Sequence, residues 1–168
     1  MIVQIIPIST LSNDKVSWYT VKLEGKDISE FKDFQQRMSK NAKDETELNE
    51  IRRYIRQIGK YLGALTKHFK HERAAERLPP PYHYIETDDP DDFGLRLYCI
   101  RLCNEIVILL NGGRKTSSNP EKCPNCSSHF KLANRIAIKI NEAILENNME
   151  LDIEAREIVI EGDFELEI

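Results

Sequence analysis

Alternation between apolar and polar positions predicts two strands near the N-terminus. Residues 2–8 alternate weakly and are interrupted by Pro7, and residues 16–23, VSWYTVKL, are rich in β-branched and aromatic side chains. We therefore expect these two stretches to pair as strands of one sheet.

The apolar positions then change to helical spacing. A first helix is predicted to begin at Asp27, with Glu30 three residues later as an acidic capping box, and its apolar face holds Ile28, Phe31, Phe34 and Met38. Residues 41–44 form the break. A second helix from about residue 45 repeats apolar residues over four turns, at Leu48, Ile51, Ile55, Ile58 and Leu62. The two helices should pack as an αα-hairpin, and helix must stop before the prolines at 79–81.

The strongest strand signals lie at residues 95–102 and 106–110. The second of these is apolar on both faces, which is typical of a strand in the middle of a covered sheet. If Cys103-Asn104 is a two-residue turn, the strands form a hairpin in which Arg96 lies opposite Asn111. Residues 111–113, Asn-Gly-Gly, are then expected to break the ladder.

The C-terminal third is predicted to contain a helix followed by a hairpin. After a Pro- and Ser-rich loop at 116–127, a helix carries an apolar stripe at Ala133, Ile136, Ala137, Ile140, Ala143 and Ile144. In the tail, the turn is expected at Gly162, between two short runs that bury Ile158, Ile160, Phe164 and Leu166.

Together these elements predict an α+β fold. It is a small twisted, mainly antiparallel sheet packed on an αα-hairpin and a C-terminal helix, with a terminal β-hairpin extension. Residues 1–148 form the domain, and residues 149–168 are an acidic extension packed on it. With 168 residues, 40% of them hydrophobic, the chain has the size and core of one domain.

Charge and targeting signals narrow the cellular setting. No apolar run approaches 18 residues, so no membrane span is expected. The N-terminus MIVQIIPIST lacks a basic segment and a cleavage site, so we expect no signal peptide, a cytoplasmic location and reduced cysteines.

The net charge of −4 conceals an asymmetry along the chain. Residues 142–168 hold ten acidic residues and one basic residue, so the preceding body is mildly basic. The tail is either a solvated hairpin or a segment that covers a basic surface able to contact RNA or a ribosome. Arg52, Arg56 and Lys60 follow one another at four-residue spacing on the second helix, as a solvated face or as an RNA-binding face.

The order of these elements resembles the RelE/ParE superfamily of toxins, especially its HigB-like, phage-associated branch. The segments that carry the resemblance are an arginine-containing strand, LRLYCIR (95–101), an apolar strand, IVILL (106–110), a small-residue break with basic residues, NGGRKT (111–116), Pro120, and a helix from Phe130 to Ala137. The likeness covers about residues 16–145. The chain departs from the family pattern in its length, its CPNC loop and its acidic tail.

The resemblance implies a toxin that is neutralised by a cognate helix-turn-helix antitoxin. RelE-like and HigB-like members cut mRNA on the ribosome, whereas ParE-like members inhibit gyrase. The function expected here is therefore that of a type II toxin, a ribosome-dependent mRNA endonuclease that uses no cofactor. The alternatives are a non-catalytic interaction module of the same fold and a small zinc-stabilised nucleic-acid-binding protein.

Metal-independent RNA cleavage requires a base, an acid and cations for the phosphorane. Arg96, Arg114 and Lys115 are the predicted cations, because the expected register brings them to one edge of the sheet. Arg96 could instead pair with Asp91 or Asp92, and Arg114 and Lys115 could be a solvated turn. The acid or base would be His83, unless it is only an exposed loop residue. Tyr98 shares the face of Arg96 and could stack an RNA base or pack in the core.

The cysteines offer a weak metal site. Cys123, Cys126 and His129 have the spacing of a zinc half-site, but a second C-x-x-C is absent from the sequence. Structural zinc, a redox pair and incidental cysteines remain the three interpretations, and no metal is the expectation.

Overall fold

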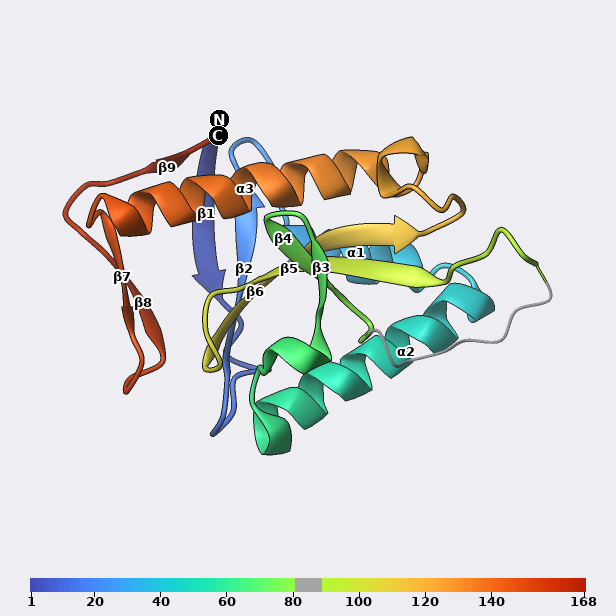
Figure 1. The fold of residues 1–168 in the computed structure, drawn as a ribbon, viewed down its shortest axis with the longest axis horizontal. Helices are drawn as coiled ribbons and strands as arrows, with labels where there is room; N and C mark the ends of the chain where they lie inside the picture. The colour runs from blue at the N-terminus through green and yellow to red at the C-terminus, as the bar shows by residue number, and fades with distance from the viewer. Residues whose placement is uncertain (81–88) are drawn as a thin grey trace.

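The predicted α+β class is confirmed by a computed structural model, which describes residues 1–80 and 89–168. Its main sheet has seven strands in the order β3-β4-β5-β6-β2-β1-β9 (Figure 1). Only the pair β2–β6 is parallel among these neighbours. The strands are β1 (Ile2–Pro7), β2 (Ser17–Leu23), β3 (Lys70–Glu72), β4 (Ala75–Leu78), β5 (Leu95–Arg101), β6 (Ile106–Arg114) and β9 (Leu166–Glu167).

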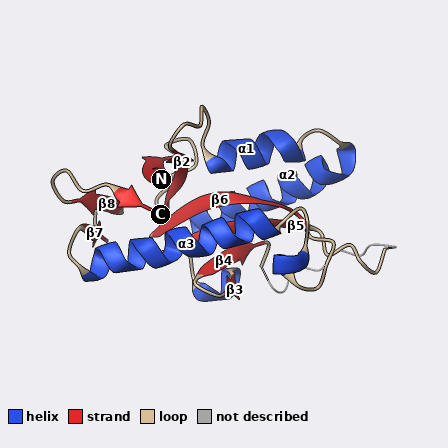
Figure 2. Cartoon of the chain, turned by 90° about the horizontal axis from the view of Figure 1, so that it is seen from above, coloured by secondary structure: helices blue, strands red, loops and turns tan. Residues whose placement is uncertain are grey.

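Helices cover both faces of the sheet, so the molecule has three layers (Figure 2). Helices α1 (Glu30–Met38) and α2 (Ala42–Gln57) lie on one face, and α3 (Ser127–Leu145) crosses the other. Strand β6 shows why its sequence is apolar on both sides. Its residues point alternately into the two cores: Val107 and Leu109 toward α1 and α2, and Ile106, Ile108 and Leu110 toward α3.

Both predicted helices of the αα-hairpin are present, but each begins at a different residue than expected. Helix α1 begins after Ser29, whose hydroxyl accepts a hydrogen bond from the Lys32 amide (3.4 Å), so the cap predicted at Asp27 is wrong. Helix α2 begins at Ala42, because Asn41 caps it by accepting from the Asp44 amide (2.9 Å). The chain continues past α2 as a π-helical turn (Ile58–Leu62) and a 3-10 turn (Thr66–His68).

Two short strands, β3 and β4, were not predicted. They have three and four residues and are rich in charge, so no period-2 pattern marks them in the sequence. Strand β4 pairs with β5 and places Arg77 opposite Tyr98, and β3 places Lys70 opposite Arg77. The basic stretch before the prolines is therefore part of the sheet.

The central hairpin is confirmed, but its predicted register is wrong. The connection spans Leu102–Glu105, which moves the pairing by one residue, and a bulge moves it by one more between Leu97 and Cys99. Arg96 consequently lies opposite Gly113 instead of Asn111. The expected break at 111–113 is also absent, because β6 continues to Arg114.

The tail forms the predicted hairpin with a different turn. Strand β7 (Met149–Asp152) pairs with β8 (Glu157–Ile160), so the turn lies at 153–156, and Gly162 instead precedes β9, which extends the main sheet beside β1. Of the four side chains expected to be buried, Leu166 is buried and Ile160 is exposed. The hairpin lies at the C-terminal end of α3, far from the N-terminal end of β5, so it does not cover the basic surface predicted around Arg96 (Figure 1).

Candidate functional site

Arg114 lies on the α2 face of the sheet, enclosed by three carboxylates. Its guanidinium contacts Asp44 at 2.7 Å, Asp92 at 2.8 Å and Glu47 at hydrogen-bonding distance. Burial favours the neutral guanidine, but the hydrogen bonds to Asp44, Asp92 and Glu47 outweigh it and raise the pKa of Arg114. Burial raises the pKa of Asp92, but its hydrogen bonds from Lys43, the Gly94 amide and Arg114 outweigh burial and lower the pKa to about 2. Arg114 is therefore a structural cation with its donors committed.

Arg96 lies on the opposite face, beneath the N-terminal end of α3. The ring of Tyr98 packs on Phe130 of α3. Arg96 lies two residues before Tyr98 in the same strand, so its side chain is on the same face. The prediction that Arg96, Arg114 and Lys115 form one patch is therefore wrong for Arg114. The physical cause is that β6 continues as a strand to Arg114, where a break was predicted. Arg114 pairs with Leu95 and takes its face, whereas Arg96 pairs with Gly113 on the other face.

Arg96 and Lys115 nevertheless come together, with two cations that sequence reasoning missed. Cross-strand pairing puts Lys70 and Arg77 on the face of Arg96, and the Lys115 amide donates to the Gly94 carbonyl at 2.9 Å, which brings Lys115 beside β5. We call Lys70, Arg77, Arg96 and Lys115 the cation row.

The cation row carries more positive charge than its surroundings neutralise. Glu72 pairs with the buried Arg77 at 3.0 Å. Arg96 and Lys115 have no carboxylate within 4 Å in residues 1–80 and 89–168, and the buried Nε of Arg96 has no hydrogen-bond partner there. Burial and then the neighbouring Arg77 lower the pKa of Arg96 to about 10, and burial and then Arg96 lower the pKa of Lys115. This arrangement suits a bound anion.

Tyr98, another predicted site residue, is part of the core and not of the row. Tyr98 is 1% exposed and packs edge-on against Phe130 with ring centroids 5.8 Å apart, so the prediction that it stacks an RNA base is wrong and core packing is correct. His83, the predicted acid or base, lies outside the described residues.

Among the candidate zinc residues, the two cysteines lie near each other and His129 points away from them. Cys123 and Cys126 are buried, and their sulfurs contact the Arg114 and Gly113 carbonyls at 3.6 Å. His129 turns toward Arg37 on the other side (3.4 Å), and burial together with Arg37 lowers its pKa to about 4. In the part of the chain that the structure describes, no three metal-ligating side chains converge.

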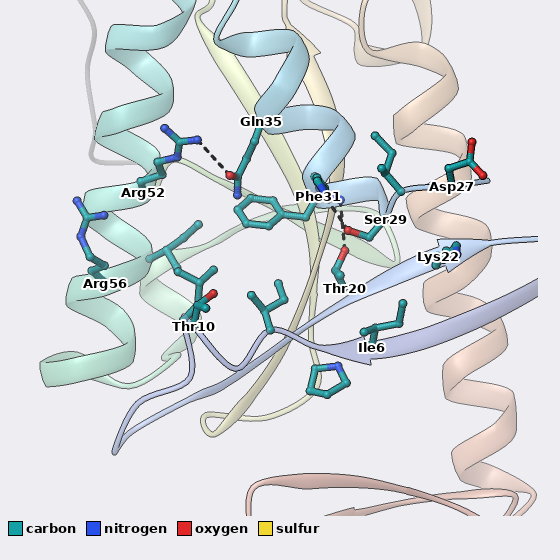
Figure 3. A pocket seen from close by; sticks show the side chains of 16 residues that line it. Ile6, Thr10, Thr20, Lys22, Asp27, Ser29, Phe31, Gln35, Arg52 and Arg56 are labelled. Atoms are coloured by element: carbon teal, nitrogen blue, oxygen red, sulfur yellow. Dashed lines mark hydrogen bonds between the residues drawn. The ribbon is translucent and has the colours of Figure 1, made fainter.

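The RNA-binding residues predicted on the second helix divide into two groups, because α2 ends at Gln57 and Lys60 lies in the π-helical turn that follows. Arg52 and Arg56 line a groove between α2, α1 and the first two strands, with a volume of about 620 Å³ (Figure 3). Lys60 is not part of that lining and lies over the ring of Tyr61 at 5.2 Å. The groove also contains Lys22 and Lys32, which no spacing pattern in the sequence connects with α2.

The chain matches no protein-family model, no curated protein and no solved structure at a significant level. The likeness to RelE/ParE toxins therefore rests on the sequence segments alone. Among the described helices, none has both the length and the apolar character of a membrane span.

Proposed function

We propose that this protein binds RNA through its phosphate backbone at the cation row. The observation that carries the proposal is the uncompensated pair Arg96 and Lys115 beside the buried Arg77. Holding like charges together in a partly buried site is unfavourable, and a bound phosphate reverses that effect. Arginine suits this role because its planar fork matches two phosphate oxygens.

The extent of the row supports a polyanion over a single small anion. Lys70, Arg77 and Arg96 come from three adjacent strands, and Lys115 follows the fourth. Neighbouring strands are about 4.8 Å apart, so the row extends over about 14 Å. A row of this length can contact successive phosphates of one strand.

Binding should be lost when the two uncompensated cations are removed together. We expect Arg96→Gln with Lys115→Gln to weaken binding of a labelled RNA oligonucleotide by at least about tenfold, as measured by fluorescence anisotropy. The slope of log K against log salt should become shallower by about 1.4, since two phosphate contacts are lost from a single strand. Both side chains are half-buried, so circular dichroism and thermal unfolding must show that the variant is folded.

The matched control removes two exposed cations elsewhere, with Lys15→Gln and Lys26→Gln. This control should retain nearly all of the affinity and the original salt slope. If both double variants lose affinity equally, binding depends on the net charge of the protein and not on the position of the cations, which would contradict a site at the cation row.

A second candidate is the toxin function, ribosome-dependent cleavage of mRNA controlled by a helix-turn-helix antitoxin. The observation that favours it is that two of the predicted catalytic cations, Arg96 and Lys115, lie together. They would stabilise the phosphorane, without Arg114. The base in this candidate would be the predicted His83, which lies outside the described residues.

Inducible expression without a partner tests the second candidate. If the protein is a toxin, growth should stop and mRNA should be cleaved, and the Arg96→Gln, Lys115→Gln variant should restore growth at equal protein level. Arg114 must stay intact in this test, because its replacement would lower activity by destabilising the fold. If expression of the native chain is harmless and mRNA stays intact, the toxin function is contradicted and RNA binding without cleavage remains the proposal.

A further inference from the structure

The groove on the other face of the sheet is a separate feature from the cation row. Strands β1 and β2, helix α1 and the C-terminal half of α2 enclose it, with Ile6 and Thr20 on the strands and Arg52 on the facing helix (Figure 3). Its volume of about 620 Å³ falls within the range of about 300–1,000 Å³ that is usual for small-molecule sites.

The floor of the groove is apolar. Phe31 and Ile55 are 4% and 1% exposed and form its base, and Ile6, Ile8 and Leu11 are half-buried along its wall. These aliphatic side chains retain contact with water in the empty groove. Covering them with an apolar ligand body is favourable by about 25 cal/mol for each Å² removed from water.

The charged groups around this floor have one predominant sign. Lys22, Lys32, Arg52 and Arg56 line the groove, and Asp27 is the one acidic residue among the described lining. Within residues 1–80 and 89–168, no carboxylate lies within 4 Å of any of the four cations. The groove therefore combines an apolar base with uncompensated positive charge.

Neutral partners hold one of these cations in place. The Arg52 guanidinium donates to the side-chain oxygens of Gln35 and Asn49, both at 3.1 Å, and Figure 3 shows the Gln35 contact bridging α1 and α2. Because amides orient the guanidinium without neutralising it, its charge remains available to a ligand. An oriented donor also loses less conformational entropy on binding.

Two hydroxyl groups of the groove already accept hydrogen bonds from backbone amides. The Thr20 hydroxyl accepts from the Phe31 amide (3.2 Å), and the Ser29 hydroxyl accepts from the Lys32 amide (3.4 Å). The four cations are the predominant charged groups of the lining, and they select an anionic group. Phe31, the aromatic side chain of the lining, is buried, so the groove offers no exposed ring on which a nucleic-acid base could stack.

We infer that this groove binds a small amphipathic organic anion, whose apolar body covers Ile6, Ile8 and Leu11 and whose carboxylate or phosphate contacts Arg52 and Arg56. The site is independent of the cation row, since the sheet separates them. The ligand class follows from an apolar floor of small-molecule size combined with cations that have no carboxylate partners.

The probes are decanoate and decyl phosphate, added to the full-length protein below their micellar concentrations. We expect saturable shifts of backbone amide resonances from the groove in two-dimensional NMR spectra. Octyl glucoside, a neutral amphiphile, and decyltrimethylammonium, a cationic one, should bind at least about tenfold more weakly. Comparison of the two anions tells whether a carboxylate or a phosphate is preferred, and tight binding of either one supports the site.

A pair of variants tests the assignment to Arg52 and Arg56. Their joint replacement by glutamine should weaken anion binding by at least about tenfold, whereas Arg53→Gln, on an exposed neighbour outside the groove, should leave it unchanged. The comparison of anionic with neutral probes requires no variant, so it decides the question even if the double variant fails to fold.

Several results would overturn this inference. Equal affinity for the neutral amphiphile would show that the charge does not select the ligand, and unchanged anion binding in the double variant would place the head group elsewhere. If RNA or increasing protein concentration shifts the groove resonances while neither anion does, the groove belongs to a nucleic acid or to a second copy of the chain. Loss of RNA binding in the Arg96→Gln, Lys115→Gln variant leaves the groove unaffected, so the two proposals fail separately.

Discussion

Replacing Arg114 with methionine should lower the free energy of unfolding by about 3–5 kcal/mol at pH 7. The reason is what the substitution leaves behind. Asp44, Glu47 and Asp92 have side-chain exposures of 14%, 10% and 5%, so their charges would stay close together and largely shielded from water. Urea unfolding followed by circular dichroism measures the loss.

The pH dependence of this loss identifies its cause. The pKa of Asp92 is lowered to about 2 in the folded protein, so its contribution is present above pH 4 and disappears as the pH falls toward 2. Without Arg114 that contribution is smaller, so the native protein and the variant should approach each other in stability over this range. Lys115→Met is the matched control and should change stability by less than about 1 kcal/mol. A similar stability of the Arg114 variant and the native chain at pH 7 would contradict the structural role of this arginine.

Replacing Gly112 with alanine should abolish folding or reduce stability by more than about 4 kcal/mol. A Cβ at this position would lie 1.8 Å from the carbonyl oxygen of Arg96 and 3.2 Å from the Cα of Leu97. Both are backbone atoms of the paired strand, so no side-chain rotation relieves the overlap. The strands could separate only by breaking the pairing of Leu97 with Gly112 at the centre of the sheet.

The control for Gly112 is a glycine with a positive φ and open space around it, where an added Cβ would meet no other atom. Gly25 has a φ of +76° and nothing within 4 Å of its would-be Cβ, so alanine there should reduce stability by about 1 kcal/mol. Thermal unfolding compares the two variants directly. If Gly112→Ala folds with native stability, the close approach at the bulge, and the register of Arg96 with it, would be incorrect.

These two variants bear on how functional experiments should be designed. Arg114 and Gly112 are both within the segment that resembles the toxin family, where a loss of activity would ordinarily be attributed to catalysis. For both residues, the contacts in the structure indicate that a loss of activity would come from impaired folding. Arg96 and Lys115 are the pair whose removal tests RNA binding, because they have no carboxylate partners in the described residues.

Local patterns carried much of the fold. The apolar stripes of the three helices, the paired strands β1 and β2, and the central hairpin follow from side-chain spacing, which is a property of a few consecutive residues. The run 106–110 even indicated its environment, because apolar residues on both faces require cover on both faces. Helix starts were less well predicted, since Asp27, Ser29 and Asn41 are all residues that cap helices.

The candidate site depended on features that are not local. Whether Arg114 shares a face with Arg96 is decided by the continuation of β6 to Arg114, where it pairs with Leu95 and the residue spacing predicted a break. The carboxylates that enclose Arg114 are 22 to 70 residues away in the chain. The cation row includes Lys70 and Arg77, on strands of three and four residues that are too short to show a period.

The sequence by itself thus determined the class of the fold, the two helical layers and the covered central strand, because periodicity reports which side of each element is buried. Only the tertiary structure decided which charges meet. In the folded protein Arg114 pairs with three carboxylates, and Arg96 and Lys115 lie near Arg77. Arg52 and Lys22 line the same groove. The physical reason is that charge pairing depends on strand register and on the packing of distant elements. The spacing of residues along the chain carries no information on either.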